Sequence, residues 1–112
     1  MRKIAFLFAG QGSQYPGMGK ELADRSSAAA EVFDLADRQR PGTAEQCFSG
    51  SKEELSRTCN TQPCVYCVDL AAAMALRQAG VVPQAVAGFS LGEVAALTFA
   101  GAFSPEEGFD FV

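Results

Sequence analysis

One serine of the chain has the surroundings of a nucleophile. Residues 88–92 read Gly-Phe-Ser-Leu-Gly, with Ser90 at the centre, and they fall between an apolar run and an alanine-rich stretch. This context indicates a sharp turn from a strand into a helix, which lifts the Ser90 hydroxyl group away from the sheet. At the amino end of the following helix, free backbone N–H groups and the helix dipole favour negative charge. The pattern therefore indicates acyl transfer through a serine ester.

Two backbone amides could stabilise the oxyanion of such a reaction. The N–H group of Leu91 directly follows the nucleophile and supplies the first donor. The second donor usually comes from a loop after another strand, and Gln11 holds that place, just past an apolar run at residues 4–9. Gly10 and Gly12 flank it and let its amide approach a bound group closely. One such donor typically lowers the barrier by about 3 kcal/mol.

Each motif alone is also compatible with a purely structural role. The G-x-S-x-G pattern arises by chance, and glycine-rich loops after strands are often only turns. Their joint occurrence, each after its own strand, favours catalysis. The chain has no histidine, so the usual base for a serine nucleophile is absent from these 112 residues. Glu93 could substitute for it, but an acid at that place also suits the start of a helix, which is the interpretation we favour.

The rest of the sequence predicts an α/β fold. Apolar runs predict buried strands at residues 3–9 and 85–89, and four glycines and a proline predict a loop at residues 10–19. Asn60 or Thr61 is the expected cap of the longest helix, with Pro63 in its first turn. Helices are expected at residues 20–40 with a break near residues 26–27, at 51–58, from residue 60 or 61 to about 80, at 91–100, and from 105 onwards.

Composition excludes several classes of function. The net charge of −4 and the lack of a basic patch argue against a nucleic-acid partner. No run approaches the roughly 20 apolar residues of a membrane span. The amino terminus resembles a secretion signal, but its apolar core at residues 4–9 is shorter than the usual range of about 7–15. A first strand and a cytoplasmic location are expected instead, with the four cysteines present as thiols.

The cysteines allow a metal-site hypothesis that we do not favour. Cys59, Cys64 and Cys67 match the start of a plant-type iron–sulfur pattern, but no fourth cysteine follows them. A zinc site would need a second Cys pair or histidines. Cys64 and Cys67, three residues apart on an expected helix, are better interpreted as small buried apolar side chains. No metal and no redox cofactor is expected.

Three motifs in this order resemble a known family. They are residues 8–14 (Phe-Ala-Gly-Gln-Gly-Ser-Gln), residues 61–63 (Thr-Gln-Pro) and residues 88–93 (Gly-Phe-Ser-Leu-Gly-Glu). They look like the amino-terminal part of malonyl-CoA:acyl carrier protein transacylases, and the acyltransferase domains of fatty acid and polyketide synthases are similar. The resemblance extends over all 112 residues and covers little more than the first third of the family enzyme.

The resemblance implies a fold, a reaction and two partners. The fold would be the hydrolase-like large subdomain, a parallel sheet with flanking helices, with residues 1–112 as its amino-terminal part. Ser90 would take the malonyl group from malonyl-CoA as an ester and pass it to the pantetheine thiol of acyl carrier protein. The amides of Gln11 and Leu91 would form the oxyanion hole and contact the substrate. Leu91 also resembles the residue found in malonyl-selecting members.

Parts of the family's site are missing or changed here. The carboxylate-binding arginine and the catalytic histidine of the family would fall beyond Val112, as would its small ferredoxin-like subdomain. The family commonly has histidine where this chain has Phe89, which loses a polar contact beside the nucleophile. We therefore expect an incomplete piece that is inactive alone. Two alternatives remain: a serine hydrolase or thioesterase, in which water completes the reaction, and a non-catalytic truncated or decayed homologue.

Overall fold

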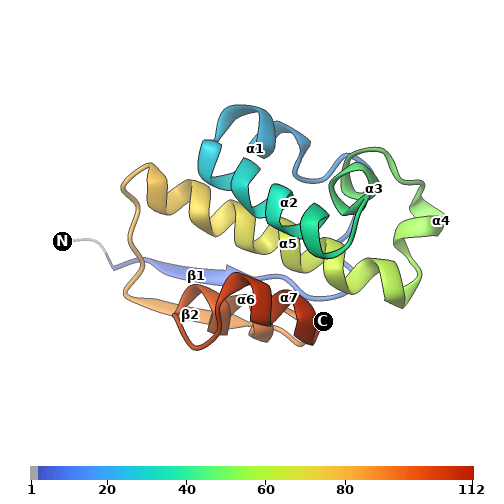
Figure 1. Ribbon diagram of the computed structural model, residues 1–112. Coiled ribbons are helices and arrows are strands. Elements are labelled where there is room, and N and C mark those ends of the chain that lie inside the picture. The colour runs from blue at the N-terminus through green and yellow to red at the C-terminus, as the bar shows by residue number, and fades with distance from the viewer. Residues whose placement is uncertain (1–2) are drawn as a thin grey trace.

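The computed structural model describes residues 3–112 and has a small parallel sheet packed against helices, which confirms the α/β class (Figure 1). The two residues that begin the signal-like pattern lie outside the described part. In chain order the elements are β1 (Ala5–Phe8), α1 (Lys20–Arg25), α2 (Ser27–Gln39), α3 (Thr43–Ser49), α4 (Lys52–Leu55), α5 (Thr58–Gln78), β2 (Ala85–Gly88), α6 (Gly92–Phe99) and α7 (Pro105–Phe111).

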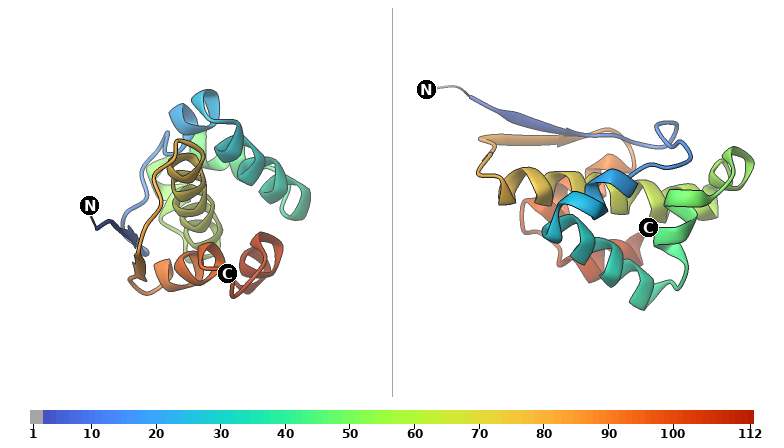
Figure 2. Two further views of the ribbon diagram at one scale, coloured as in Figure 1. Left: turned by 90° about the vertical axis from the view of Figure 1, so that its left-hand side faces the viewer. Right: turned by 90° about the horizontal axis from the view of Figure 1, so that it is seen from above.

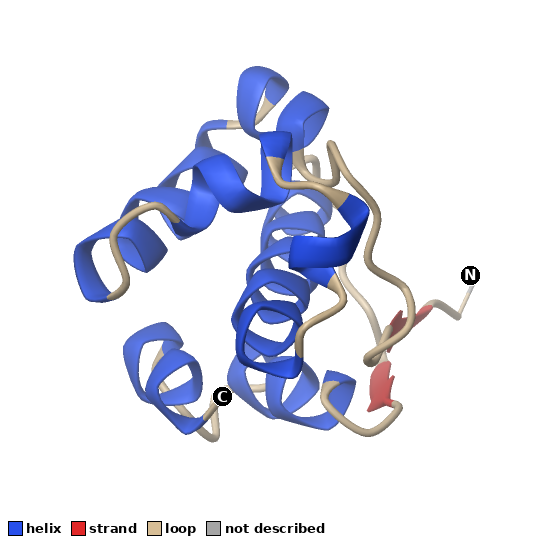
Figure 3. Cartoon of the chain, turned by 90° about the vertical axis from the view of Figure 1, so that its right-hand side faces the viewer, coloured by secondary structure: helices blue, strands red, loops and turns tan. Residues whose placement is uncertain are grey.

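Both predicted strands are present, and they pair in parallel, but the prediction that they are buried was wrong, because within the described residues helices cover only one face of the sheet. Ala5 lies opposite Ala85, and the register continues to Phe8 opposite Gly88. Side chains alternate along β1, so that Phe6 and Phe8 are buried against the helices while Leu7 is 81% exposed. Figures 2 and 3 show the strands at one side of the molecule and the helices on the other. Within the described residues, one face of the sheet carries the core and the other is open.

Helix α5 is the centre of the packing. It contacts the sheet-side helix α6 as well as α1, α2, α3, α4 and α7. The Tyr66 hydroxyl group donates to the Pro105 carbonyl oxygen (2.9 Å) and lies 3.1 Å from the Thr98 hydroxyl group. A single buried tyrosine thus connects α5 to both helices that follow the serine turn.

The start of α5 differs from the prediction. The helix begins at Thr58, so Asn60 and Thr61 lie in its first turn and Pro63 lies inside the helix. The Asn60 Oδ1 atom accepts a hydrogen bond from Arg40 Nη2 (2.9 Å), and the Thr61 hydroxyl group donates to main-chain carbonyl groups of the preceding turn. The predicted cap was wrong because the helix already starts after Arg57, so the Thr61 hydroxyl group bonds back to nearby carbonyl groups while Asn60 bonds to Arg40.

The region before α5 holds one confirmed break and one unpredicted helix. Ser26 separates α1 from α2, and its hydroxyl oxygen accepts from the Ala29 N–H (3.2 Å) as a cap for α2. Helix α3 occupies a stretch for which the sequence predicted no element. It follows Gly42, whose φ is 87°, and it buries Thr43 and Cys47.

The two helices after the serine turn agree with the prediction. Helix α6 ends at Phe99, shortly before Gly101, which has a φ of 94°. Helix α7 begins with a complete capping box, because the Ser104 side chain accepts from the Glu107 N–H (3.1 Å) and Glu107 accepts from the Ser104 N–H (2.9 Å). In residues 3–112, no helix has the length and apolar character that crossing a membrane requires.

Candidate functional site

Ser90 lies at the sharp turn between β2 and α6. Its φ is 56°, and no other non-glycine residue between positions 3 and 112 has a positive φ. Residues with a Cβ atom rarely adopt this left-handed conformation, because the side chain crowds the backbone. Ser90 is also exposed. This backbone geometry is the one that a strand–turn–helix elbow needs to present a hydroxyl group above a sheet.

The glycines of the motif allow the elbow to close. A Cβ atom at Gly88 would overlap the backbone of Gly92, because the chain turns back on itself across Ser90. A Cβ atom at Gly92 would overlap the Phe8 carbonyl group and lie 2.9 Å from the Ala9 carbonyl oxygen. The obstructing atoms belong to the main chain and cannot rotate away. Glycine is therefore required at both positions of the motif for steric reasons, and Gly92 allows the elbow to pack directly on the end of β1.

The turn that carries Gln11 lies against the same elbow. Parallel strands end at the same edge of a sheet, so the loops after β1 and β2 leave side by side. The Phe89 N–H donates to the Phe8 carbonyl oxygen (3.2 Å) one step beyond the strand pairing. A Cβ atom at Gly10 would overlap the Phe89 carbonyl oxygen. The structure therefore brings the two turns together, as the sequence predicted.

The main chain of both turns is available for a ligand. The Gln11 side chain donates from Nε2 to the Thr58 hydroxyl oxygen (3.3 Å) at the start of α5, while Gln11 itself remains exposed. The Leu91 side chain is buried, so only its backbone could serve a ligand. In the part of the chain that the structure describes, the backbone N–H groups of Gln11 and Leu91 have no hydrogen-bond acceptor. Among the described residues, each of the two adjoining turns thus contains one backbone donor without an acceptor.

Comparison with known proteins shows to which family the chain belongs. Residues 5–112 match the acyl transferase domain family. The chain belongs to the acyl transferase domain family. Over 105 residues it is 46% identical to the malonyl CoA-acyl carrier protein transacylase of Bacillus subtilis (strain 168), a match that covers 93% of this chain and 33% of that protein. A polyketide synthase of Streptomyces halstedii is 44% identical over 108 residues, covering 93% of this chain and 2% of the synthase.

Solved structures show the same relationship. The malonyl CoA-acyl carrier protein transacylase of Clostridium perfringens superposes with a TM-score of 0.90 at 39% identity, over 97% of this chain and 35% of that one. The acyl-carrier-protein S-malonyltransferase of Burkholderia pseudomallei has a TM-score of 0.91 at 38% identity, over 97% and 36% of the two chains. The chain thus spans about a third of the length of the transacylases that it matches.

Phe89 lies at the elbow directly before Ser90. Phe89 is 78% exposed and follows Ala87 on the open face of the sheet, the face that also presents Leu7. A ring carbon of Phe89 lies 3.5 Å from the position that a Cβ atom at Gly10 would occupy. Phe89 therefore lies against Gly10, directly before Gln11, as well as preceding Ser90. Glu93 is exposed in the first turn of α6, a place that suits an acid.

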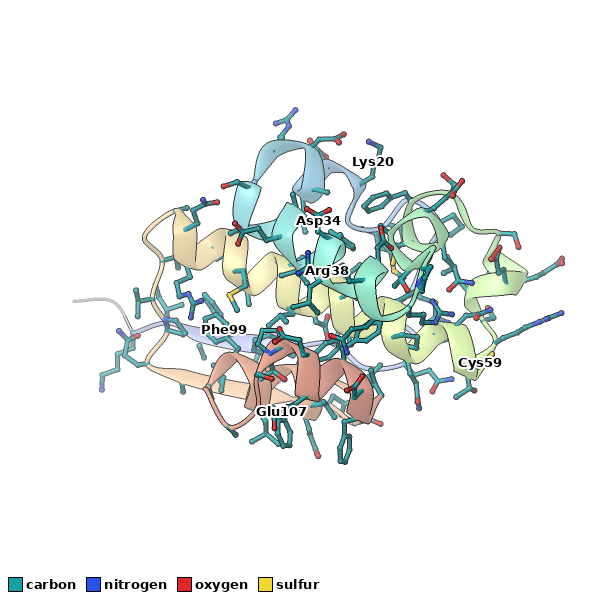
Figure 4. All side chains as sticks on the ribbon, in the orientation of Figure 1. Lys20, Asp34, Arg38, Cys59, Phe99 and Glu107 are labelled. Carbon is teal, nitrogen blue, oxygen red and sulfur yellow. The ribbon has the colours of Figure 1, made fainter. Side chains whose placement is uncertain are left out.

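Three cysteines are buried and one is exposed. Cys47, Cys64 and Cys67 lie in the core as free thiols, whereas Cys59 is exposed near the start of α5 (Figure 4). The burial predicted for Cys64 and Cys67 is confirmed. Burial raises the pKa of Cys67 well above its usual range, so its thiol stays protonated at neutral pH. Within residues 3–112, no three His, Cys, Asp or Glu side chains are grouped to hold a metal ion.

Sequence reasoning missed one charged residue that faces strand β1. Asp69 is the one charged side chain between positions 58 and 76 of α5, where its neighbours along the chain are mostly apolar or small. The structure places its side chain in the wall of an open cavity that strand β1 also lines, and its Oδ2 atom is buried without a partner in residues 3–112. An isolated acid in an apolar helix is a signal for such a site, but the sequence alone does not say what it contacts.

Proposed function

We propose that the chain supplies the nucleophile and the oxyanion site for malonyl transfer from malonyl-CoA to the pantetheine thiol of acyl carrier protein, in fatty acid or polyketide synthesis in the cytoplasm. The positive φ of Ser90, in an elbow packed against the Gln11 turn, is the observation that carries the proposal. The names of the relatives support the choice of donor and acceptor.

The reaction has two balanced steps. The Ser90 Oγ atom attacks the thioester carbonyl carbon, the new C–O bond replaces the C–S bond, and coenzyme A leaves as a thiol after accepting the serine proton. The pantetheine sulfur then attacks the ester carbonyl carbon and returns the proton to Ser90. In both tetrahedral intermediates the negative oxygen accepts hydrogen bonds from the N–H groups of Gln11 and Leu91. The amino end of α6 adds its dipole to the same stabilisation.

The proton transfers need a base that these residues do not supply. The chain contains no histidine, and Glu93 suits the start of α6. In this proposal the base and the group that binds the malonyl carboxylate come from residues outside these 112, in the two thirds of the relatives that the chain does not match. We therefore expect no measurable turnover from residues 1–112 alone.

A hybrid enzyme tests the proposal and separates transfer from hydrolysis. Residues 1–112 replace the matching third of the Bacillus subtilis transacylase, and the hybrid is mixed with malonyl-CoA and acyl carrier protein. We expect malonyl-acyl carrier protein as the main product, and none from the Ser90→Ala variant. Release of free malonate instead would indicate a hydrolase. A folded hybrid that forms neither product, beside an active parent enzyme, would contradict the proposal.

A further inference from the structure

The turn that carries Gln11 needs support from outside itself. One backbone hydrogen bond closes it, from the Ser13 N–H to the Gly10 carbonyl oxygen (3.4 Å). Glycine on each side of Gln11 leaves the main chain free to adopt many conformations, and Gly12 has a φ of 109°. Around the position of a Cβ atom at Gly12, no atom beyond its chain neighbours lies within 4 Å. The turn alone therefore does not set the direction of the Gln11 N–H group.

Thr58 supplies that support from a helix. The Gln11 Nε2 atom donates to the Thr58 Oγ1 atom (3.3 Å), across 47 positions of the sequence. In the part of the chain that the structure describes, this is the only hydrogen bond between residues 10–14 and a helix. On the β2 side, Gly10 lies against the Phe89 carbonyl group, which a Cβ atom would overlap. The turn is thus tied both to the serine elbow and to the start of α5.

The first turn of α5 is itself firmly anchored, so it can hold the loop in place. The buried Thr61 hydroxyl group donates to the carbonyl oxygen of Arg57 (2.9 Å), directly before Thr58. The Asn60 Oδ1 atom accepts from Arg40 Nη2 (2.9 Å), at the end of α2. Thr58 therefore lies on a fixed element, and a rigid support of this kind is what precise placement of a reacting group requires.

We infer that Thr58 is a positioning residue for the oxyanion turn: its hydroxyl oxygen holds the Gln11 side chain and thereby orients the Gln11 backbone N–H group. This inference rests on the proposed function, in which that N–H group is an oxyanion donor. Thr58 acts through Gln11 and does not touch the reacting atoms. The second sequence motif, which begins at Thr61, then has a part in the site, because Thr61 fixes the helix turn that carries Thr58.

Three substitutions separate the hydroxyl group from the rest of the side chain. Thr58→Val keeps the branched shape and removes the acceptor, Thr58→Ala removes both, and Thr58→Ser keeps the hydroxyl group. Ser56→Ala is the matched control, because Ser56 is exposed two positions earlier and its Oγ atom donates to the Lys52 carbonyl oxygen (2.8 Å). The control removes a hydroxyl group from the same segment without touching Gln11.

Nuclear magnetic resonance on the 112-residue chain measures positioning without any turnover. In Thr58→Val and Thr58→Ala we expect the Gln11 backbone amide signal to move, and its order parameter to fall from about 0.85 to about 0.6 or below. Thr58→Ser and Ser56→Ala should keep the wild-type signal. An ordered and unshifted Gln11 amide in Thr58→Val would overturn the inference. Should valine disturb α5 itself, Thr58→Ala decides in the same way.

The same substitutions in the hybrid enzyme link positioning to rate. A displaced oxyanion donor weakens an interaction made in the transition state, so kcat should fall about three- to tenfold in Thr58→Val while the KM for malonyl-CoA stays unchanged. Thr58→Ser should restore kcat. A merely structural role predicts less folded enzyme instead, with an unchanged kcat for each active site, and that result would also overturn the inference.

Failure of the proposed function looks different. In that case the wild-type hybrid forms no malonyl-acyl carrier protein, while the Gln11 amide signal of the isolated chain still shows whether Thr58 holds the turn.

Discussion

At the scale of single residues, the site depends on backbone conformations that ordinary residues avoid. Ser90 adopts a positive φ, which costs free energy that a residue at a regular position would not lose. Asp69 is likewise placed against its own solvation preference. Ser90 follows strand β2, and Asp69 lines a cavity along strand β1, so both unfavourable placements border the small sheet.

Replacing Ser90 by glycine should stabilise the chain. Glycine adopts positive φ values without a side-chain penalty, so the free energy of unfolding should rise by about 1 kcal/mol relative to Ser90→Ala. Urea denaturation of the two variants measures the difference. Alanine is the matched control because it also lacks the hydroxyl group but keeps the strained Cβ atom. Equal stabilities would show that the elbow is not strained in solution.

Asp69 should make stability depend on pH in a definite direction. Its pKa is about 7 in the folded chain and about 3.9 in an unfolded one, so the folded state binds more protons between these values. Stability is therefore lost as the pH rises from about 4 to about 7. Relative to the wild type, Asp69→Asn should gain about 1–2 kcal/mol between pH 5 and pH 8, less than the full shift because the group is partly exposed.

Urea denaturation of the wild type and of Asp69→Asn, at about pH 5 and about pH 8, measures the gain in the free energy of unfolding. The Asp34→Asn variant serves as the control and should follow the wild type at both. The account of Asp69 requires that the difference in unfolding free energy between the wild type and Asp69→Asn changes with pH. A constant difference would contradict the raised pKa of Asp69.

At the scale of elements, the site is formed where α6 starts against the end of β1. Gly92 is the contact point, since any Cβ atom there would meet the Phe8 carbonyl group. The aromatic rings of Phe6 and Phe8 pack on Phe99 at the other end of α6, with ring centroids 5.4 and 6.0 Å apart. The helix is thereby fixed to the strand at both ends, which holds the elbow in place.

Gly92→Ala should be destabilising although alanine favours helices. Alanine in a helix is normally better than glycine by about 1 kcal/mol, but here the added methyl group must push α6 away from β1. We expect a loss of about 1–3 kcal/mol in the free energy of unfolding, measured by thermal or urea denaturation. Leu97→Ala, on the exposed side of the same helix, should change stability much less. A more stable Gly92→Ala variant would refute the close contact.

Local signals in the sequence predicted the elements that depend on local chemistry. The break at Ser26, the cap at Ser104 and both strands follow from side chains close in the chain, and the structure contains them. Helix α3 and the true start of α5 depend on partners from other elements, such as the bond between Arg40 and Asn60, and so they could not be predicted. The burial of Asp69 against β1 is hidden for the same reason, since the strand is distant in sequence.

At the scale of the whole molecule, the open face of the sheet is the most distinctive feature. Leu7 and Phe89 are largely exposed there, and Ala5, Ala85 and Ala87 lie on the same face. A contiguous apolar surface of this kind favours association. The Gln11 turn and the Ser90 elbow lie at the end of this surface, so whatever covers it in a larger assembly also borders the site.

The isolated chain should therefore associate through this face. Leu7→Ser should lower the association constant by about tenfold, because it removes exposed apolar area without disturbing the core. Sedimentation equilibrium over a range of concentrations measures the effect. Leu97→Ser, an exposed leucine on α6 rather than on the sheet, is the control. Equal effects of the two substitutions would show that the sheet face is not the associating surface.

The position of the acyl group on the protein tests the central claim most directly. The hybrid enzyme is mixed with malonyl-CoA without acyl carrier protein, and its intact mass and digested peptides are measured by mass spectrometry. We predict one malonyl group, attached to Ser90 and absent from the Ser90→Ala variant. A malonyl group on another residue, or none on a folded hybrid whose parent enzyme is acylated under the same conditions, would contradict the account.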